Sequence, residues 1–300
     1  MHSLFDRPYL MLCLVGLFWG GNMVLGRAII ADLPPVTLAF ARWAGALLLA
    51  LPFAWKHLRR DWPAIRQSWP LMLTLGVTGV GLYNTMAYNG LRHTQAINGL
   101  LMQSSTPIFA MLWVFALFGD RPTWRQMMGI ALSTIGIIVI ASHGKLADLL
   151  TLNLNSGDLW IIAGLVVYTF YMALVKKRPP MHGLSFFTVT CAIGALTQVL
   201  LYPLERAAGL VAHFTPLALA VMVYTMIFPG LLAYLFFNRS LELIGANRAA
   251  PFSHLTPVFG TILAVVFLGE QFALFHAVGI ALVGGGIIVA SRAASRQSTS

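Results

Sequence analysis

The sequence predicts an all-α integral membrane protein, with ten transmembrane helices forming two inverted five-helix repeats around a central cavity. The first observation is composition: 58% of the residues are hydrophobic and 9% are charged, against about 25% charged in soluble domains. The second is a series of ten apolar segments. The third is a repeat, because TPIF at 106–109 returns as TPVF at 256–259 in a chain of 300 residues. A chain with so little polar surface is expected to fold in lipid.

The ten apolar segments are each long enough to cross a hydrocarbon core of about 30 Å, which takes about 20 helical residues. The first continues too long for a signal peptide and lacks a small-residue cleavage site, so it is expected to be a retained helix. Residues 290–300 form a short polar tail. The segments lie near 9–30, 37–55, 71–90, 95–118, 123–141, 157–175, 184–202, 217–237, 245–268 and 272–291.

Basic residues predict the side of the membrane on which the termini lie. With ten spans both termini share one side, and the segments of that side carry fourteen Lys and Arg residues against four on the opposite side. The positive-inside rule therefore places both termini in the cytoplasm. The net charge of +10 is divided among short clusters between apolar runs. This pattern fits a lipid bilayer as partner and not a nucleic acid.

The repeat divides the chain into halves at 1–150 and 151–300. A shift of 150 aligns residues 81–140 with 231–290 without a gap, and fifteen of the sixty positions are identical. Because each half holds an odd number of spans, the second half is expected to enter the membrane inverted. The charges agree, since GDRPTWR at 119–125 is basic and its counterpart GEQFALF at 269–275 is acidic. Inverted repeats of this kind are a recurring plan of membrane transporters.

Two prolines are expected to kink a matched pair of helices. Pro107 and Pro257 each lack an N–H, so the carbonyls of Gln103 and Ser253 would lose their helical partners. Freed carbonyls at membrane depth are tolerated where they are buried in protein or line a wet cavity. One interpretation is a shared central site; the other is a packing kink in which a serine or a water satisfies the carbonyl.

Polar and aromatic residues inside the apolar segments are candidates for that site. Asparagine and glutamine are costly in a span unless they find partners. A lone tyrosine is more often an interfacial anchor, but several spans that carry Tyr, Trp, Asn and Gln predict a polar-aromatic pocket. In chain order the candidate substrate-binding residues are Trp19, Asn22, Tyr83, Asn84, Tyr88, Gln103, Tyr168, Tyr171, Tyr234, Asn238, Ser253 and His254.

Two charged or titratable residues have alternative interpretations. Arg42 lies about two turns into the second span. It either snorkels or is structurally paired, or it clamps a substrate carboxylate. His254 is either a hydrogen-bonded structural histidine or a proton sensor.

Several chemistries lack the residues that they need. All nine acidic residues fall in loops or near segment ends, so no buried carboxylate is expected to bind a cation or relay protons. No GxxxxGK[ST], HExxH or GxSxG motif is present, and Cys13 and Cys191 are isolated thiols. We expect no catalytic residues, no metal and no cofactor.

WGGNMVLGR at 19–27, ARW at 41–43, the two TPxF motifs, and GD and GE at 119–120 and 269–270 resemble the EamA family. This is the ten-helix branch of the drug/metabolite transporter superfamily, and the chain looks most like its YddG-type exporters of aromatic and other amino acids. The resemblance implies a basket of ten helices around a central cavity in the bacterial inner membrane. The superfamily's four-helix multidrug members use a first-span glutamate, where this chain has Trp19 and Asn22.

These observations together predict a secondary transporter that exports amino acids by alternating access. Tyrosine and tryptophan faces would hold the side chain of the substrate, and the amides and carbonyls would meet its polar groups. One alternative is a multidrug or metabolite exporter of the same fold. Another is a non-transporting membrane receptor or scaffold, although such a protein would normally carry a sizeable soluble domain. Two complementary halves in one chain are expected to work as a monomer.

Overall fold

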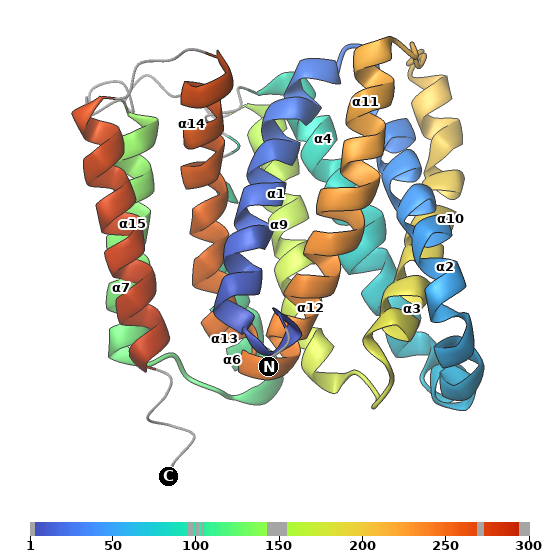
Figure 1. The fold of residues 1–300 in the computed structure, drawn as a ribbon, viewed down its shortest axis with the longest axis horizontal. Helices are drawn as coiled ribbons and strands as arrows, with labels where there is room; N and C mark the ends of the chain where they lie inside the picture. The colour runs from blue at the N-terminus through green and yellow to red at the C-terminus, as the bar shows by residue number, and fades with distance from the viewer. Residues whose placement is uncertain are drawn as a thin grey trace.

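The computed structural model describes residues 4–94, 99, 102–103, 105–142, 155–268 and 273–293. Every regular element in this part of the chain is helical (Figure 1). The expected polar tail from 294 onward, residues 143–154 and 269–272, and parts of the expected fourth span lie outside the described residues. The first elements are η1 (Leu4–Asp6), α1 (Pro8–Ile29), α2 (Pro35–Gln67), α3 (Trp69–Gly76), η2 (Val77–Leu82), α4 (Tyr83–His93), α6 (Thr106–Phe118) and α7 (Trp124–Ala141).

The remaining elements follow in the second half of the chain. They are α9 (Ser156–Leu174), η3 (Val175–Lys177), α10 (Gly183–Ala207), α11 (Pro216–Thr225), η4 (Met226–Leu232), α12 (Ala233–Ile244), α13 (Ala246–Ala249), η5 (Ala250–His254), α14 (Leu255–Leu268) and α15 (Leu274–Ala293). Five continuous helical stretches among the described residues are long and apolar enough to cross a membrane. They begin at Pro8, Pro35, Ser156, Gly183 and Pro216. The helices α6, α7 and α15 are apolar but shorter.

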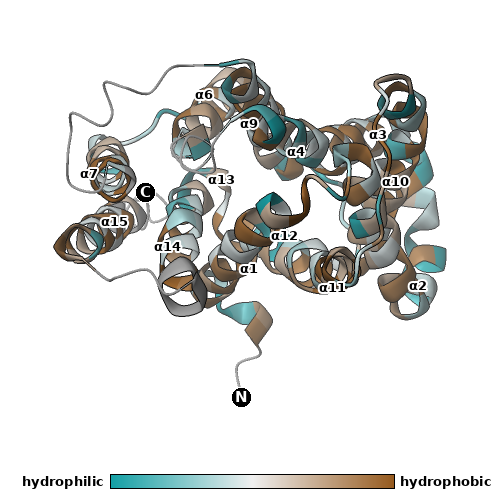
Figure 2. Cartoon of the chain, turned by 90° about the horizontal axis from the view of Figure 1, so that it is seen from above, coloured by the Kyte–Doolittle hydropathy of each residue, from teal (hydrophilic) through white to brown (hydrophobic). Residues whose placement is uncertain are grey.

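The two halves of the chain interdigitate. The closest helix pairs are α2 with α10, α7 with α15, α4 with α9, α6 with α9, and α1 with α12 and α14. Every one of these pairs joins an element before residue 142 to one after residue 155. Seen from above, α6, α9 and α4 form one row and α14, α1, α12 and α11 another (Figure 2). The pair α7 and α15 lies beyond one end of the rows, and α2, α3 and α10 lie at the other.

Both termini of the bundle lie at one end. In Figure 1, α1 begins and α15 ends at the lower end, which also holds the turns that connect α6 to α7 and η3 to α10. We call this the basic end, because the turns there carry Arg121, Lys176, Lys177 and Arg178. It is the end that the positive-inside rule assigns to the cytoplasm.

Each helix of the α2–α10 pair is capped by a carboxylate from the other. Glu205, near the end of α10, accepts hydrogen bonds at 2.6 Å from the backbone N–H of Val36 and from Thr37 Oγ1 at the start of α2. Asp61, near the end of α2, accepts from the His182 N–H at 2.8 Å and from Ser185 Oγ at 2.7 Å at the start of α10. A helix N-terminus presents unpaired N–H groups and favours negative charge. The two caps therefore hold the pair together at opposite ends.

The cap at the basic end includes a histidine whose protonation is unfavourable. The ring of His182 accepts a hydrogen bond from the Leu184 N–H and stacks on His57 at 3.6 Å. Burial, together with the neighbouring His57 and Arg60, lowers the pKa of His182 from its usual 6.5. The folded protein then binds this proton less readily than the unfolded chain does. The His182 contribution to stability is complete above pH 6.5 and decreases as the pH falls below it.

We therefore expect the thermal stability of the detergent-solubilised protein to decrease when the pH is lowered from about 8 to about 5, in part through His182. Replacement by asparagine keeps a good N-cap without a titratable ring. His182→Asn should reduce the slope of melting temperature against pH below 6.5, the usual pKa. An unchanged slope would show that His182 does not contribute to the acid sensitivity.

The repeated prolines lie where helical structure starts or changes type. Pro107 is the second residue of α6, and Pro257 is the third residue of α14, which follows η5. A proline in a first helical turn costs little, because its missing N–H would have no helical partner there. The carbonyl of Gln103 is not free either, since it accepts a hydrogen bond at 2.7 Å from Thr106 Oγ1. Pro107 thus lies at a helix start and not in mid-helix, whereas Pro257 follows the 3₁₀-helical η5 within a helical run from Ala246 to Leu268, so the kink at Pro257 stays a prediction.

The interrupted helices are those of the third and eighth expected spans. A π-helical turn, η2, separates α3 from α4, and another, η4, separates α11 from α12. The shift of 150 that relates the two halves places residues 77–82 on residues 227–232, so the two turns coincide in the repeat. Turns of this kind are rare and are frequent at functional sites. They lie beside the site described next.

Candidate functional site: a buried arginine within an aromatic wall

A buried arginine lies where α2 meets α1, α4 and η4. Arg42 lies two turns into α2 and is 2% exposed. One amino group of its guanidinium, Nη1, donates to Asn84 Oδ1 at 3.0 Å, to the Tyr88 hydroxyl at 3.3 Å and to Asn22 Oδ1 at 3.5 Å. The other, Nη2, donates to the Pro229 carbonyl at 2.8 Å. Arg42 is structurally paired and does not snorkel.

The residues around Arg42 also hydrogen-bond to one another. Tyr88 donates to Asn22 Oδ1 at 2.9 Å, and Trp19 Nε1 reaches the Pro229 carbonyl at 3.4 Å. Asn22 and Trp19 are three residues apart on α1, and Asn84 and Tyr88 are four apart on α4, so each pair shares a helix face. Two helices of the first half and one π-helical turn of the second half thus converge on one guanidinium.

The site has more hydrogen-bond donors than acceptors. Arg42 Nε and Asn84 Nδ2 are buried, and neither has a hydrogen-bond partner among the described residues. Within the same part of the chain no carboxylate forms an ion pair with Arg42. A buried charge without a counter-ion is costly. The arrangement is chemically suited to an acceptor with negative charge.

Aromatic rings enclose the site. Tyr168 on α9 stacks on Tyr83 with ring centroids 4.5 Å apart and meets the edge of Trp19 at 6.0 Å. Phe237 on α12 lies 5.1 Å from Trp19. Trp43 packs against Tyr234 and lies under the Arg42 guanidinium, 4.7 Å from its ring centroid. The rings provide an apolar, polarisable wall beside the charge.

The space left between these side chains is small. A cavity of about 30 Å³ remains, enough for one or two waters and far below the roughly 300 Å³ of a typical ligand pocket. A central cavity was expected, and in this structure Arg42 and the aromatic side chains leave only this small space. The cavity is lined by Trp19, Asn22, Met23, Arg42, Tyr83, Asn84, Ala87, Tyr88, Gln103 and Tyr234.

Seven of the candidate residues therefore line one cavity, and the others lie around or away from it. Tyr168 lies in the ring stack beside the cavity. Tyr171 donates to Asn238 Oδ1 at 2.5 Å in a neighbouring buried cluster. Ser253 and His254 are in η5, where His254 Nδ1 lies 2.7 Å from Ser133 Oγ of α7. They do not line the cavity, and His254 has the contacts of a hydrogen-bonded structural histidine.

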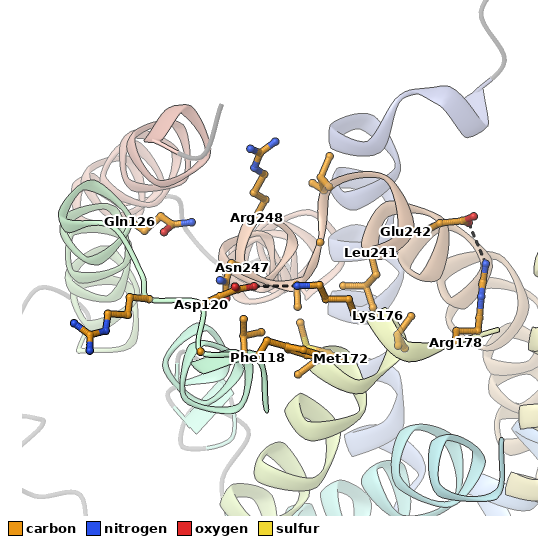
Figure 3. Close-up of a pocket in the computed structure, with 18 of the residues that line it drawn as sticks. Phe118, Asp120, Gln126, Met172, Lys176, Arg178, Leu241, Glu242, Asn247 and Arg248 are labelled. Atoms are coloured by element: carbon orange, nitrogen blue, oxygen red, sulfur yellow. Dashed lines mark hydrogen bonds and ion pairs between the residues drawn. The ribbon is translucent and has the colours of Figure 1, made fainter. Parts of the chain in front are cut away.

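A much larger cavity, of about 1140 Å³, opens at the basic end. It lies between the ends of α6, α9 and α12 and the short helix α13 (Figure 3). Two ion pairs occur among its lining residues: Lys176 with Asp120 at 3.0 Å and Arg178 with Glu242 at 3.3 Å. We call this larger cavity the vestibule. Met172 lines it, and Tyr168 lies one helical turn earlier on α9. Tyr168 therefore lies between the vestibule and the central cavity.

Arg42 was the residue whose role the sequence left open. A charge inside an apolar segment is a signal for a functional position, but spacing alone does not show what it meets. The vestibule could not be anticipated, because it is formed by turns that are distant in sequence.

Comparison with known proteins agrees with this architecture. Residues 6–142 and 155–292 each match the sequence profile of the EamA-like transporter family. The chain belongs to the EamA-like transporter family. It is accordingly a multi-pass membrane transporter, and nothing in the family description points to an enzyme.

Two relatives and one solved structure are similar to this EamA-like transporter over most of its length. The uncharacterized transporter YyaM of Bacillus subtilis (strain 168) is 25% identical over 289 residues, covering 94% of this chain and 93% of YyaM. A probable terminal-alkyne amino-acid exporter of Streptantibioticus cattleyicolor is 27% identical over 225 residues, covering 74% and 73%. A crystal structure aligns over 97% of this chain and 99% of its own, with a TM-score of 0.78 at 18% identity. This last likeness concerns the fold alone.

Proposed function

We propose that this EamA-like transporter exports amino acids, and that Arg42 binds the carboxylate of the substrate. The observation that carries the proposal is the buried guanidinium, which has an unused Nε donor and no protein carboxylate among the described residues. A ligand carboxylate supplies the missing counter-ion and accepts the spare hydrogen bonds. Asn84 Nδ2, also without a described partner, is a further donor for the same group.

The remaining surfaces of the site suit the rest of an amino acid. The Pro229 carbonyl and the Asn22 oxygen are acceptors near Arg42 and can meet an ammonium group. The wall of Trp19, Tyr83 and Tyr168 offers stacking or cation–π contacts to a side chain. A zwitterion has no net charge, which fits a site without an acidic residue. The name of the Streptantibioticus relative supports the same class of substrate.

Alternating access would arise from two inverted halves of five spans each, divided near residue 150. Three features support this: the family profile matches twice, the two π-helical turns coincide in the repeat, and the α2–α10 pair carries reciprocal caps. The vestibule of about 1140 Å³ at the basic end, beside a nearly closed centre, fits a state that opens to the cytoplasm. The carrier would act as a monomer in a bacterial inner membrane, with both termini cytoplasmic.

Loss of the ring at Tyr168 is expected to abolish transport, because this ring forms the wall of the site and separates it from the vestibule. Tyr168→Ala should reduce amino-acid uptake into proteoliposomes at least ~100-fold at unchanged expression. The matched control is Tyr168→Phe, which keeps the ring and removes a buried hydroxyl that has no described partner. It should transport nearly as well as the unmodified protein. Normal uptake by both Tyr168→Ala and Gln103→Ala would contradict the site assignment.

A further inference from the structure

The Pro229 carbonyl is available because of the π-helical turn. In an α-helix the N–H of Ala233 would bond to the carbonyl four residues earlier, which is that of Pro229. In η4 it bonds to the Phe228 carbonyl instead. The Pro229 carbonyl is thereby left for side chains, and it accepts from Arg42 Nη2 and Trp19 Nε1. Gly79, at the matching position of η2, likewise accepts from the Tyr234 hydroxyl.

These hydrogen bonds link the two halves of the transporter. Arg42 belongs to the first half, and its other partners, Asn22, Asn84 and Tyr88, belong to the first half as well. Pro229 belongs to the second half. Tyr234 and Gly79 form the corresponding link in the opposite direction. Of these two links at the π-helical turns, the Arg42 link involves a charged group, so it is the one that an ionic ligand can compete for.

The edge of the guanidinium that faces Pro229 is the edge that a carboxylate would take. Nε and Nη2 lie on the same side of the planar group and form a two-pronged donor. Nε has no described partner, and Nη2 is held by a neutral carbonyl. The bond from Nη2 to the neutral Pro229 carbonyl has a charge on the donor alone, whereas a carboxylate adds a negative charge and a second, parallel hydrogen bond from Nε. A carboxylate can therefore displace the Pro229 carbonyl from Nη2.

We propose that the head group of an α-amino acid inserts into the Arg42–Pro229 hydrogen bond: the carboxylate takes Nε and Nη2 of Arg42, and the ammonium group takes the vacated Pro229 carbonyl. The inference rests on the proposed amino-acid transport. It assigns to Pro229 the role of ammonium acceptor, and it makes the substrate the link between the two halves. Because the carboxylate and the ammonium group are attached to one carbon, the site selects ligands that carry both.

The test of selectivity uses L-phenylalanine and two analogues that each lack one group. 3-Phenylpropionate lacks the ammonium group, and 2-phenylethylamine lacks the carboxylate. Both should compete with labelled phenylalanine for uptake into proteoliposomes at least ~10-fold less well than unlabelled phenylalanine does. Competition by either analogue as strong as that of phenylalanine would overturn the two-group assignment.

The link itself is tested in the empty protein by hydrogen–deuterium exchange of peptides that cover residues 226–234. Arg42→Met removes the donor to Pro229, and Arg42→Lys keeps a cationic donor without the fork. Exchange should be faster in Arg42→Met than in the unmodified protein, with Arg42→Lys in between. Equal exchange in all three would overturn the link. If the unmodified protein takes up no amino acid, the proposed function fails together with the head-group insertion, whereas this exchange result stands on its own.

Discussion

Arg42→Met is expected to abolish amino-acid uptake without lowering the stability of the protein. The side chain is buried without a described counter-ion, so its removal relieves a desolvation cost, and this gain offsets the cost of about 1–3 kcal/mol for each neutral acceptor that loses its donor. Truncation of one partner of a buried, charged hydrogen bond costs about 2–5 kcal/mol of binding free energy, which predicts a loss of at least ~30-fold in uptake rate at low substrate concentration. Both uptake and melting temperature should be measured on the same preparations.

Two control variants separate charge from geometry at this position. Arg42→Lys keeps the charge but not the planar fork and should retain part of the activity, about 10-fold below the unmodified protein. Arg66→Lys makes the same change on an exposed arginine of α2 and should have no effect. A melting temperature that falls sharply in Arg42→Met would contradict the account, because it would show that Arg42 serves to hold the fold together.

Glu205→Ala is expected to produce the largest loss of stability. The carboxylate of Glu205 is the acceptor for the backbone N–H groups of Val36 and Thr37 and for the Thr37 hydroxyl, and its side chain is 5% exposed. Each buried donor left without a partner costs about 1–3 kcal/mol, and the start of α2 would lose the charge that faces its dipole. The melting temperature in detergent should fall clearly.

Glu205→Gln is the matched control, since it keeps an oxygen acceptor and loses the negative charge. It should be destabilised less than Glu205→Ala. Asp61→Ala tests the equivalent cap at the basic end, where Asp61 holds the start of α10. A Glu205→Ala protein as stable as the unmodified one would show that the reciprocal caps do not hold the α2–α10 pair together.

The fold class followed from the sequence because its signals are local. Apolar segments of about 20 residues and an excess of basic residues on one side depend on composition alone. The identical prolines at 107 and 257 did not point to the two π-helical turns: Pro107 lies at the start of α6, and Pro257 follows the 3₁₀-helical η5. A proline that follows a break in helical structure cannot be told by sequence from one that bends a continuous helix.

Part of the site could also be predicted from local sequence signals. Asn22, Asn84 and Tyr88 could be placed together, because polar residues inside apolar spans must find partners and helical spacing shows which share a face. Sequence spacing did not show that Arg42 is their common partner, since this contact joins α2 to α1 and α4. Sequence spacing also did not show that Tyr171 and Asn238 hydrogen-bond to each other and do not line the cavity.

Uptake into liposomes that contain only the purified protein tests most directly whether this EamA-like transporter carries amino acids. Radiolabelled phenylalanine, threonine and methionine should be supplied with and without an imposed pH gradient. We expect saturable uptake that is indifferent to the gradient, because no carboxylate is among the residues that line the central cavity. No uptake of any amino acid, together with intact uptake of a lipophilic cation, would contradict the proposed amino-acid transport and would favour a multidrug exporter of the same fold.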